Sequence, residues 1–211
     1  MLSRCGDDLF AITAGSTAEA QALAARLREV GGWLEVVPGI ESVLVRFDAA
    51  LEDGADAQRQ IEAALAGPVS PIESANELLE IPVVYGGDYG PDLAELCDRT
   101  GLGADEIVAL HTGSEYRVDL MGFTPGFAFI GGLDERLRVP RRKEPRQRVP
   151  AGSVAIADGR TGLYAMASPG GWSLIGRTPL PLFDPAAAEP FALRPGMRVR
   201  FRAIPAERFD P

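Results

Sequence analysis

The first part of the chain carries two apolar periods, one typical of helices and one typical of strands. Apolar residues spaced i, i+4 and i+7 predict a helix over residues 16–30, and a second such run predicts a helix over residues 55–66. Short apolar or alternating runs predict strands before, between and after these helices, over residues 9–13, 33–37, 42–47 and 77–85. The resulting order βαββαβ is that of a ferredoxin-like domain.

The pattern changes after Gly86-Gly87. Two short helices are predicted, one that begins near Pro91 and one over Ala104–His111. Beyond them the helical period is lost, and short strand-like runs alternate with Gly and Pro turns, which is typical of a small antiparallel barrel or sandwich. The sequence therefore predicts an α+β protein, with a ferredoxin-like domain over residues 1–86 and a β-barrel domain over residues 87–211.

Composition narrows the class of protein. The 211 residues are 46% hydrophobic, which is ordinary for a chain that buries a core. No window is apolar over the roughly 18–20 residues that a membrane span needs, and the N-terminus lacks the pattern of a signal peptide. Cys5 and Cys97 are the two cysteines and form no CxxC pair. We expect a reduced, cytoplasmic protein that is not bound to a membrane.

The charge distribution is uneven. A net charge of −9 argues against binding of nucleic acid by the whole surface, yet seven of the 21 basic residues lie between Arg136 and Arg148. The only lysine, Lys143, precedes glutamate, so the chain has no P-loop. It has no GxSxG elbow, and one histidine and two distant cysteines exclude the common zinc sites. We expect another chain to supply much of any nucleotide or metal site.

His111 is the only side chain whose ordinary pKa lies near neutrality. It stands in the last turn of a predicted helix, where the helix dipole favours the protonated ring. One interpretation is an acid/base or a ligand for an anion. The other is a structural histidine that bonds to the last free carbonyls of the helix, and position alone favours this second interpretation.

Three further segments combine tight turns with aromatic or basic side chains. Pro125-Gly126 predicts a turn that places Phe123 and Phe127 on either side of a bend, either as an apolar rim or as core. The proline-spaced loop 140–150 is either a solvated basic loop or the source of one arginine that meets an anion, for which Arg148 is our choice.

The third segment contains two glycine turns that could approach a ligand closely. Ser168, Gly170 and Gly171 precede Trp172, which could stack on a ligand or lie in the core. Arg177 and Thr178 follow and could bind an anion. No general base other than His111 is evident nearby, so a complete enzyme in this chain alone is not predicted.

Taken in order, these segments resemble the KipI/PxpB family, also called allophanate hydrolase subunit 1 or carboxyltransferase domain subdomain C and D. The resemblance covers essentially the whole chain. It rests on the following stretches: Gly86–Asp92, His111-Thr112-Gly113, Gly122–Phe127, Gly131–Asp134, Arg148–Val154, Thr161-Gly162, Ser168–Trp172 and Gly176–Pro179. Three positions depart from the pattern: Arg160 replaces a common glutamine, and Ala128 and Ala165 replace common prolines.

The resemblance implies a cyclophilin-like barrel after the ferredoxin-like domain. It also implies that the chain is the B subunit of an ATP-dependent 5-oxoprolinase, which opens 5-oxoproline to glutamate. The implied partners are subunits of the KipA/PxpC and PxpA types, and ATP and Mg²⁺ are implied for the complex rather than for this chain. His111, Arg148 and Arg177 would then be catalytic. Substrate, a small anion, would be bound by the remaining matched residues: Phe123, Pro125, Gly126, Phe127, Thr161, Ser168, Gly170, Gly171, Trp172 and Thr178.

Two other functions remain open from the sequence. The chain could inhibit a histidine kinase of the sporulation type, with the turn at residues 125–127 as an apolar plug. It could instead belong to urea or allophanate metabolism, as do related domains of urea carboxylase. In each case a barrel of this size needs its sheet edges covered, so we expect a hetero-oligomer, or a homodimer when the chain is alone.

Overall fold

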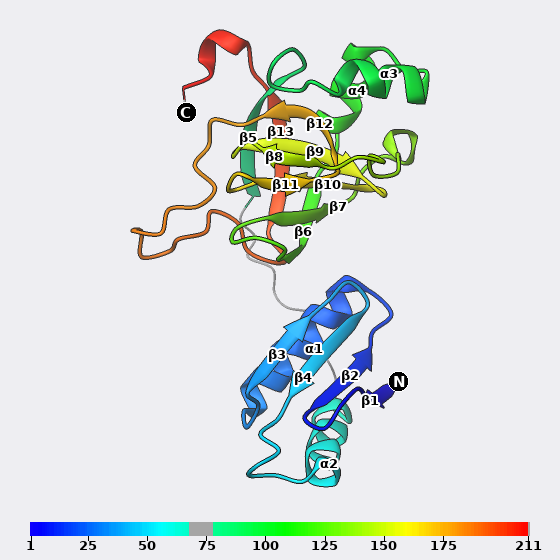
Figure 1. Ribbon diagram of the computed structural model, residues 1–211, viewed down its shortest axis with the longest axis vertical. Helices are drawn as coiled ribbons and strands as arrows, with labels where there is room; N and C mark the ends of the chain where they lie inside the picture. Colours follow the sequence, from blue (N-terminus) through cyan, green and yellow to red (C-terminus); the bar gives the residue numbers. More distant parts are fainter. Residues whose placement is uncertain (68–77, 211) are drawn as a thin grey trace. The chain divides into compact units, whose positions relative to one another are not determined.

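The computed structural model describes residues 1–67 and 78–210. The chain divides into two compact units, Met1–Ser74 and Ala75–Pro211. The first is a sheet with two helices and the second is a closed barrel with two helices (Figure 1). The predicted α+β class is confirmed.

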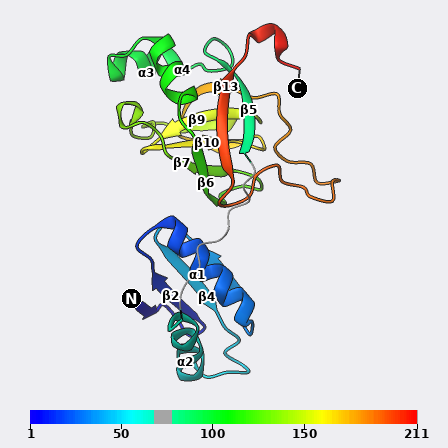
Figure 2. The ribbon, with the colours of Figure 1, turned by 180° about the vertical axis from the view of Figure 1, so that it is seen from behind.

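The first unit is an antiparallel sheet with strand order β1-β2-β4-β3. Helix α1 lies along one face of this sheet (Figure 2). Alternate residues of the central strands, such as Phe10 and Val43, face a core that also contains Leu27 and Ile61 of the two helices. The elements are β1 (Leu2–Arg4), β2 (Leu9–Thr13), α1 (Thr17–Val30), β3 (Glu35–Pro38), β4 (Ser42–Arg46) and α2 (Gly54–Leu65).

The two ends of helix α1 are determined by residues close to them in the sequence. The Ser16 hydroxyl accepts a hydrogen bond from the Glu19 amide, and the Glu19 carboxylate accepts one from the amide of Gly15. Gly31 ends the helix with a φ of 73°, a conformation that glycine adopts without strain.

The last strand predicted for the first domain belongs to the barrel instead. Glu77 lies outside the described residues, and β5 (Leu78–Tyr85) pairs with barrel strands β12 and β13. Beside β2, the short strand β1 takes the place of a fourth ferredoxin-like strand. The order is therefore ββαββα rather than βαββαβ, and the predicted boundary at residue 86 is wrong because the division precedes β5.

The barrel has seven strands in the order β10-β7-β6-β13-β5-β12-β9 and closes between β9 and β10. Its ladders are antiparallel except for β5–β13, which is parallel and departs from the expected all-antiparallel barrel. Helices α3 (Leu93–Thr100) and α4 (Ala104–Thr112) accompany it. The remaining barrel strands are β6 (Tyr116–Met121), β7 (Ala128–Gly131), β9 (Ser153–Ala157), β10 (Arg160–Leu163), β12 (Ser173–Arg177) and β13 (Arg198–Ala203).

A small second layer covers part of the barrel wall. Strands β8 (Arg146–Val149) and β11 (Ser168–Gly170) form a separate two-stranded ribbon. An aromatic cluster with Phe127 and Trp172 packs on Ala155 and Ala157 of β9, while the barrel core takes the other side of that strand. This is why every residue of β9 is buried. Short 3-10 turns complete the unit at Glu135–Leu137 and Ala206–Arg208.

Candidate functional site

A pocket of about 260 Å³ lies at the aromatic cluster; we call it the aromatic pocket. It is small for a ligand site, which suits a ligand of a few heavy atoms rather than a nucleotide. Half of its lining was predicted from sequence, and the other half was not. The predicted lining residues are Phe123, Phe127, Gly170, Gly171 and Trp172; the others are Phe129, Arg141, Pro145, Tyr164 and Pro169.

Phe127 is the centre of the aromatic pocket. Its ring centroid lies 4.8 Å from that of Tyr164 and 5.8 Å from that of Trp172, both edge to face. Two of these rings rest on strand β10 at Gly162, where a Cβ atom would lie 2.9 Å from Trp172 and 3.0 Å from Phe127. Any side chain at residue 162 would displace the rings, so this glycine is required by packing.

The Pro125-Gly126 turn separates its two phenylalanines. The Phe127 amide donates to the Thr124 carbonyl at 3.1 Å, and Gly126 has a φ of 77°. Phe127 is buried in the cluster, whereas Phe123 is 66% exposed and itself has a φ of 71°. Both interpretations of this turn therefore hold, one for each ring: Phe127 is core, and Phe123 is a rim.

Arg141 is the charged group of the aromatic pocket. Its guanidinium carbon lies 5.9 Å from the centroid of the Trp172 ring, and its Nε donates to Asp158 at 3.1 Å. The sequence singled out the arginine-rich loop but favoured Arg148. Arg148 is exposed on β8 and does not line the aromatic pocket. Phe129 could have been found by strand periodicity, since it stands two residues after Phe127.

Two other arginines of the same loop form ion pairs with a buried carboxylate. Asp92 accepts from Arg146 at 2.6 and 2.8 Å and from Arg142 at 2.9 Å, and it also accepts the Leu174 amide at 2.7 Å. The Asp92 side chain is almost wholly buried, whereas each arginine keeps about a quarter of its side chain exposed. This ion-pair hub ties the loop to α3 and β12 and holds the wall of the aromatic pocket in place.

The predicted anion ligands after Trp172 are not in the aromatic pocket either. Arg177 donates from Nε to the Ala151 carbonyl at 2.7 Å, and its guanidinium lies over the Phe209 ring. Thr178 is buried, and its hydroxyl accepts the Leu180 amide. Pro125, Gly126, Thr161 and Ser168 are likewise absent from the lining of the pocket. The binding or catalytic roles of these residues remain predictions.

His111 lies inside the barrel and is 0% exposed. Its Nδ1 is 2.7 Å from the Tyr85 hydroxyl and its Nε2 is 3.0 Å from the Thr161 hydroxyl. The single hydroxyl proton of Thr161 is directed to the Ala155 carbonyl at 3.1 Å, so His111 Nε2 must be the donor to Thr161. Nδ1 then accepts the Tyr85 proton, and the ring is neutral with both nitrogens bonded.

Burial lowers the pKa of His111 to about 3, the reverse of the shift that its place in the last helical turn favours. Burial also raises the pKa of Tyr85 far above its ordinary value, and it raises that of Tyr164 in the aromatic pocket to about 12. None of these groups exchanges a proton readily at neutral pH. The ring of His111 bonds to the side chains of Tyr85 and Thr161 rather than to helix carbonyls, so the predicted carbonyl partners are wrong.

Within the described ranges, no group of three or more His, Cys, Asp or Glu side chains could hold a metal ion. The described helices include none with the length and apolar character of a membrane span. The aromatic pocket unites five of the predicted site residues and is the candidate site for a small ligand.

Comparisons with known proteins agree on one family. A family model described as carboxyltransferase domain, subdomain C and D, matches residues 2–193. The chain is 45% identical over 194 residues to the B subunit of 5-oxoprolinase from Escherichia coli O157:H7, covering 90% of this chain and 87% of that protein. It is 41% identical over 183 residues to the B subunit of 5-oxoprolinase from Bacillus subtilis (strain 168), covering 82% and 76%.

Solved structures share the fold. The crystal structure of TTHA0988 superposes with a TM-score of 0.81 at 36% identity over 97% of this chain, which spans only 41% of that longer chain. The conserved uncharacterized protein PH0987 of Pyrococcus horikoshii gives a TM-score of 0.62 at 37% identity, covering 99% and 100%. Kluyveromyces lactis urea carboxylase, at 18% identity and a TM-score of 0.76 over 99% of this chain and 22% of its own, shares the fold alone. The chain belongs to the carboxyltransferase domain, subdomain C and D, family.

Proposed function

We propose that this chain is the B subunit of an ATP-dependent 5-oxoprolinase that acts in the cytoplasm, where it opens 5-oxoproline to glutamate together with partner subunits of the PxpC and PxpA types. The observation that carries the proposal is the identity of 38–45% to three curated proteins, each named as the B subunit of 5-oxoprolinase. Each match covers more than four fifths of this chain. The aromatic pocket adds a place for the substrate.

5-Oxoproline is a flat five-membered lactam ring with one carboxylate, and the aromatic pocket offers a partner for each part. Its ring would pack against Phe129 and Trp172, two aromatic rings that line the pocket and contact one another edge to face. Its carboxylate fits the guanidinium of Arg141, which uses only Nε for its described ion pair with Asp158. The pocket volume of about 260 Å³ suits a ligand of this size.

In this proposal the chain binds and orients the substrate and does not supply the proton carrier. His111 is excluded from that role by its buried position and its pKa of about 3, and Tyr164 by its pKa of about 12. ATP and Mg²⁺ are assigned to the complex, because the described residues contain no cluster of ligands for a metal ion. When bound there, ATP would supply the free energy for opening the amide bond.

Reconstitution of the complex tests the proposal. The chain is combined with its two partner subunits, and ATP hydrolysis is measured with and without 5-oxoproline. Loss of one charged hydrogen bond costs about 1.5–3 kcal/mol, so Arg141→Gln should raise KM for 5-oxoproline by roughly 10- to 100-fold. Arg194→Gln, a change of the same type at an exposed arginine paired with Glu189, is the control and should leave KM unchanged. ATP hydrolysis that ignores 5-oxoproline would reject the function.

One observation favours a second function, inhibition of a histidine kinase. Phe123 projects from the turn with 66% of its surface exposed and could dock on a protein partner. The buried ring of Phe127 cannot act as the plug that the sequence suggested. A kinase-binding assay with Phe123→Ala separates the two functions, because an unchanged affinity removes the inhibitor hypothesis.

A further inference from the structure

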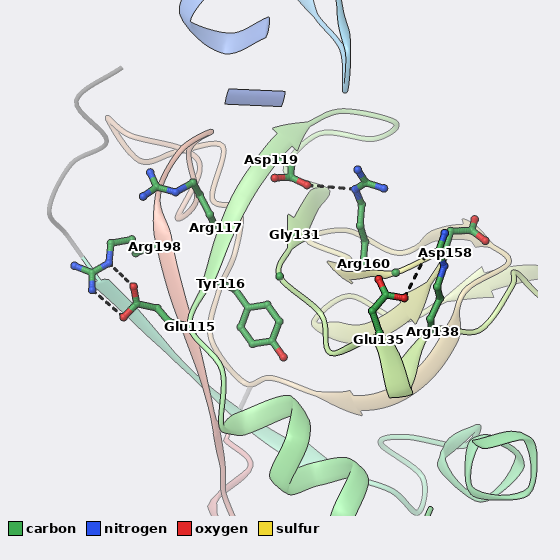
Figure 3. Close-up of a pocket in the computed structure, with 12 residues that line it drawn as sticks. Glu115, Tyr116, Arg117, Asp119, Gly131, Glu135, Arg138, Asp158, Arg160 and Arg198 are labelled. Carbon is green, nitrogen blue, oxygen red and sulfur yellow. Dashed lines mark hydrogen bonds and ion pairs between the residues drawn. The ribbon is translucent and has the colours of Figure 1, made fainter. Parts of the chain in front are cut away.

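A second cavity, of about 530 Å³, lies on the outer side of β6, β7 and β10 (Figure 3). It shares no lining residue with the aromatic pocket, although Arg141 of that pocket pairs with Asp158 of this one. We call it the charged pocket, because eight of its lining residues have acidic or basic side chains. They are Arg117, Arg138, Arg160 and Arg198 with Glu115, Asp119, Glu135 and Asp158.

The centre of the charged pocket is an ion pair built over a glycine. Arg160 donates from Nε to Asp119 at 3.2 Å, and Figure 3 shows the two side chains reaching toward one another above Gly131. A Cβ atom at residue 131 would lie 2.6 and 2.8 Å from the carboxylate oxygens of Asp119. The carboxylate therefore occupies the space that a side chain on β7 would take, and the pair depends on that glycine.

This pair leaves one edge of the guanidinium open. Among the contacts of the described residues, Arg160 uses only its Nε, so both terminal nitrogens can receive a carboxylate in the bidentate manner. Its side chain is 28% exposed, which keeps that edge accessible while the stem is held. Asp119 is partly buried, and this burial raises the pKa of its carboxyl, with Arg160 opposing the shift.

Acceptors for a cation lie in the same cavity. Glu135 contacts Arg138 through one carboxylate oxygen, and Asp158 contacts Arg141 through one. Within the described part of the chain the second oxygen of each has no hydrogen-bond partner, and both residues line the cavity together with Arg160 (Figure 3). The cavity thus combines an open guanidinium edge with carboxylate oxygens.

The balance of charge restricts the ligand. Four guanidiniums and four carboxylates cancel, so the cavity has no net attraction for a polyanion such as the triphosphate of ATP, which would approach four carboxylates. A ligand that carries a positive and a negative charge close together finds an oppositely charged side chain for each of them. The α-carboxylate and α-ammonium of an amino acid are such a pair.

We propose that the charged pocket binds a zwitterionic α-amino acid, with its carboxylate on the terminal nitrogens of Arg160 and its ammonium toward Glu135 and Asp158. Glutamate is the first ligand to test, and that choice rests on the proposed function, whose product it is. Strand β7 contributes Gly131 to this pocket and Phe129 to the aromatic pocket, so glutamate bound there would be retained or sensed beside the substrate.

Calorimetric titration of the purified full chain tests the site. The probes are L-glutamate and glutarate, which has both carboxylates but no ammonium, with ATP as a third. We expect L-glutamate to bind, glutarate to bind at least tenfold more weakly, and ATP neither to bind in the charged pocket nor to compete. Arg160→Gln should weaken glutamate binding at least tenfold, and the control Arg194→Gln should not.

Gly131→Ala provides an independent variant, because it removes no charge and displaces the Asp119 carboxylate. It should also weaken glutamate binding. Absence of glutamate binding, equal binding of glutarate, or binding that persists in both variants would overturn the inference. Activity of the reconstituted complex is measured separately, so a complex that hydrolyses 5-oxoproline without binding glutamate in the charged pocket rejects this site and leaves the proposed function standing.

Discussion

The buried histidine makes the stability of the protein depend on pH in a predictable direction. His111 is the only histidine, and its pKa of about 3 in the folded chain compares with 6.5 for an ordinary histidine. Between these values the unfolded chain binds a proton that the folded chain does not. The stabilising effect of the neutral ring is therefore complete above pH 6.5, and it is lost as the pH falls toward 3.

The size of the effect follows from the same two pKa values. Each pH unit below the unfolded pKa costs about 1.4 kcal/mol, so lowering the pH from 7.5 to 5 should reduce the free energy of unfolding by about 2 kcal/mol. Titration of other groups adds to the total, so the contribution of His111 is isolated by comparison with His111→Gln. Urea denaturation at both pH values measures it, and the change in the free energy of unfolding between them should be about 2 kcal/mol smaller in the variant.

A direct measurement does not require the variant to fold. The single imidazole gives one Cε1–H signal by NMR, whose chemical shift reports protonation of the ring. We expect no titration of this signal in the native protein down to pH 5. A midpoint between pH 5.5 and 7 would refute the buried arrangement of the ring, because it would mean that the ring is solvated or paired with an anion rather than bonded to Tyr85 and Thr161.

Three further predictions concern the walls of the aromatic pocket. Asp92→Asn should lower the free energy of unfolding by about 3 kcal/mol in urea denaturation, because it removes a buried charge that pairs with two arginines. The control Asp158→Asn breaks an exposed ion pair and should lower it by less than about 1 kcal/mol. Equal effects of the two variants would contradict the stabilising role of the buried ion pairs. Gly170→Ala should destabilise the chain and change its tryptophan fluorescence, since the added methyl group overlaps the Tyr164 hydroxyl, and a native spectrum would count against the packing described. Phe123→Gly should leave the free energy of unfolding unchanged or raise it by up to about 1 kcal/mol in thermal denaturation, because the ring is exposed and the backbone of Phe123 has a φ of 71°. A clear loss of stability would show that this ring contributes to the fold.

Local pattern predicts the elements well and their partners less well. Helices α1 and α2 and strand β4 lie within one or two residues of their predicted bounds, because apolar period and caps are local signals. Strand β5 is predicted in the wrong sheet, because its pattern of apolar and polar residues is compatible with either sheet. Its parallel partner, β13, is about 120 residues away, and no local pattern reports such a pairing.

The candidate site shows the same limit. The turns at Phe127 and Trp172 are recognisable from Gly, Pro and aromatic residues, and the structure brings both into one pocket. Which arginine of the loop faces that pocket depends on Asp92, which lies about 50 residues earlier and takes two of them. The depth of His111 is equally hidden, because the polar ring stands among aromatic residues contributed by three different strands.

The parallel β5–β13 ladder also has a consequence for the order in which the protein folds. These are the first and the last strands of the barrel along the chain, and Ile81 lies opposite Phe201. During synthesis the barrel cannot close until residue 203 has left the ribosome, so β5 waits with an unpaired edge while the strands between are made. Pairing of such distant segments is slow. The C-terminal unit should therefore reach its native state only at the step when its last strand docks beside its first.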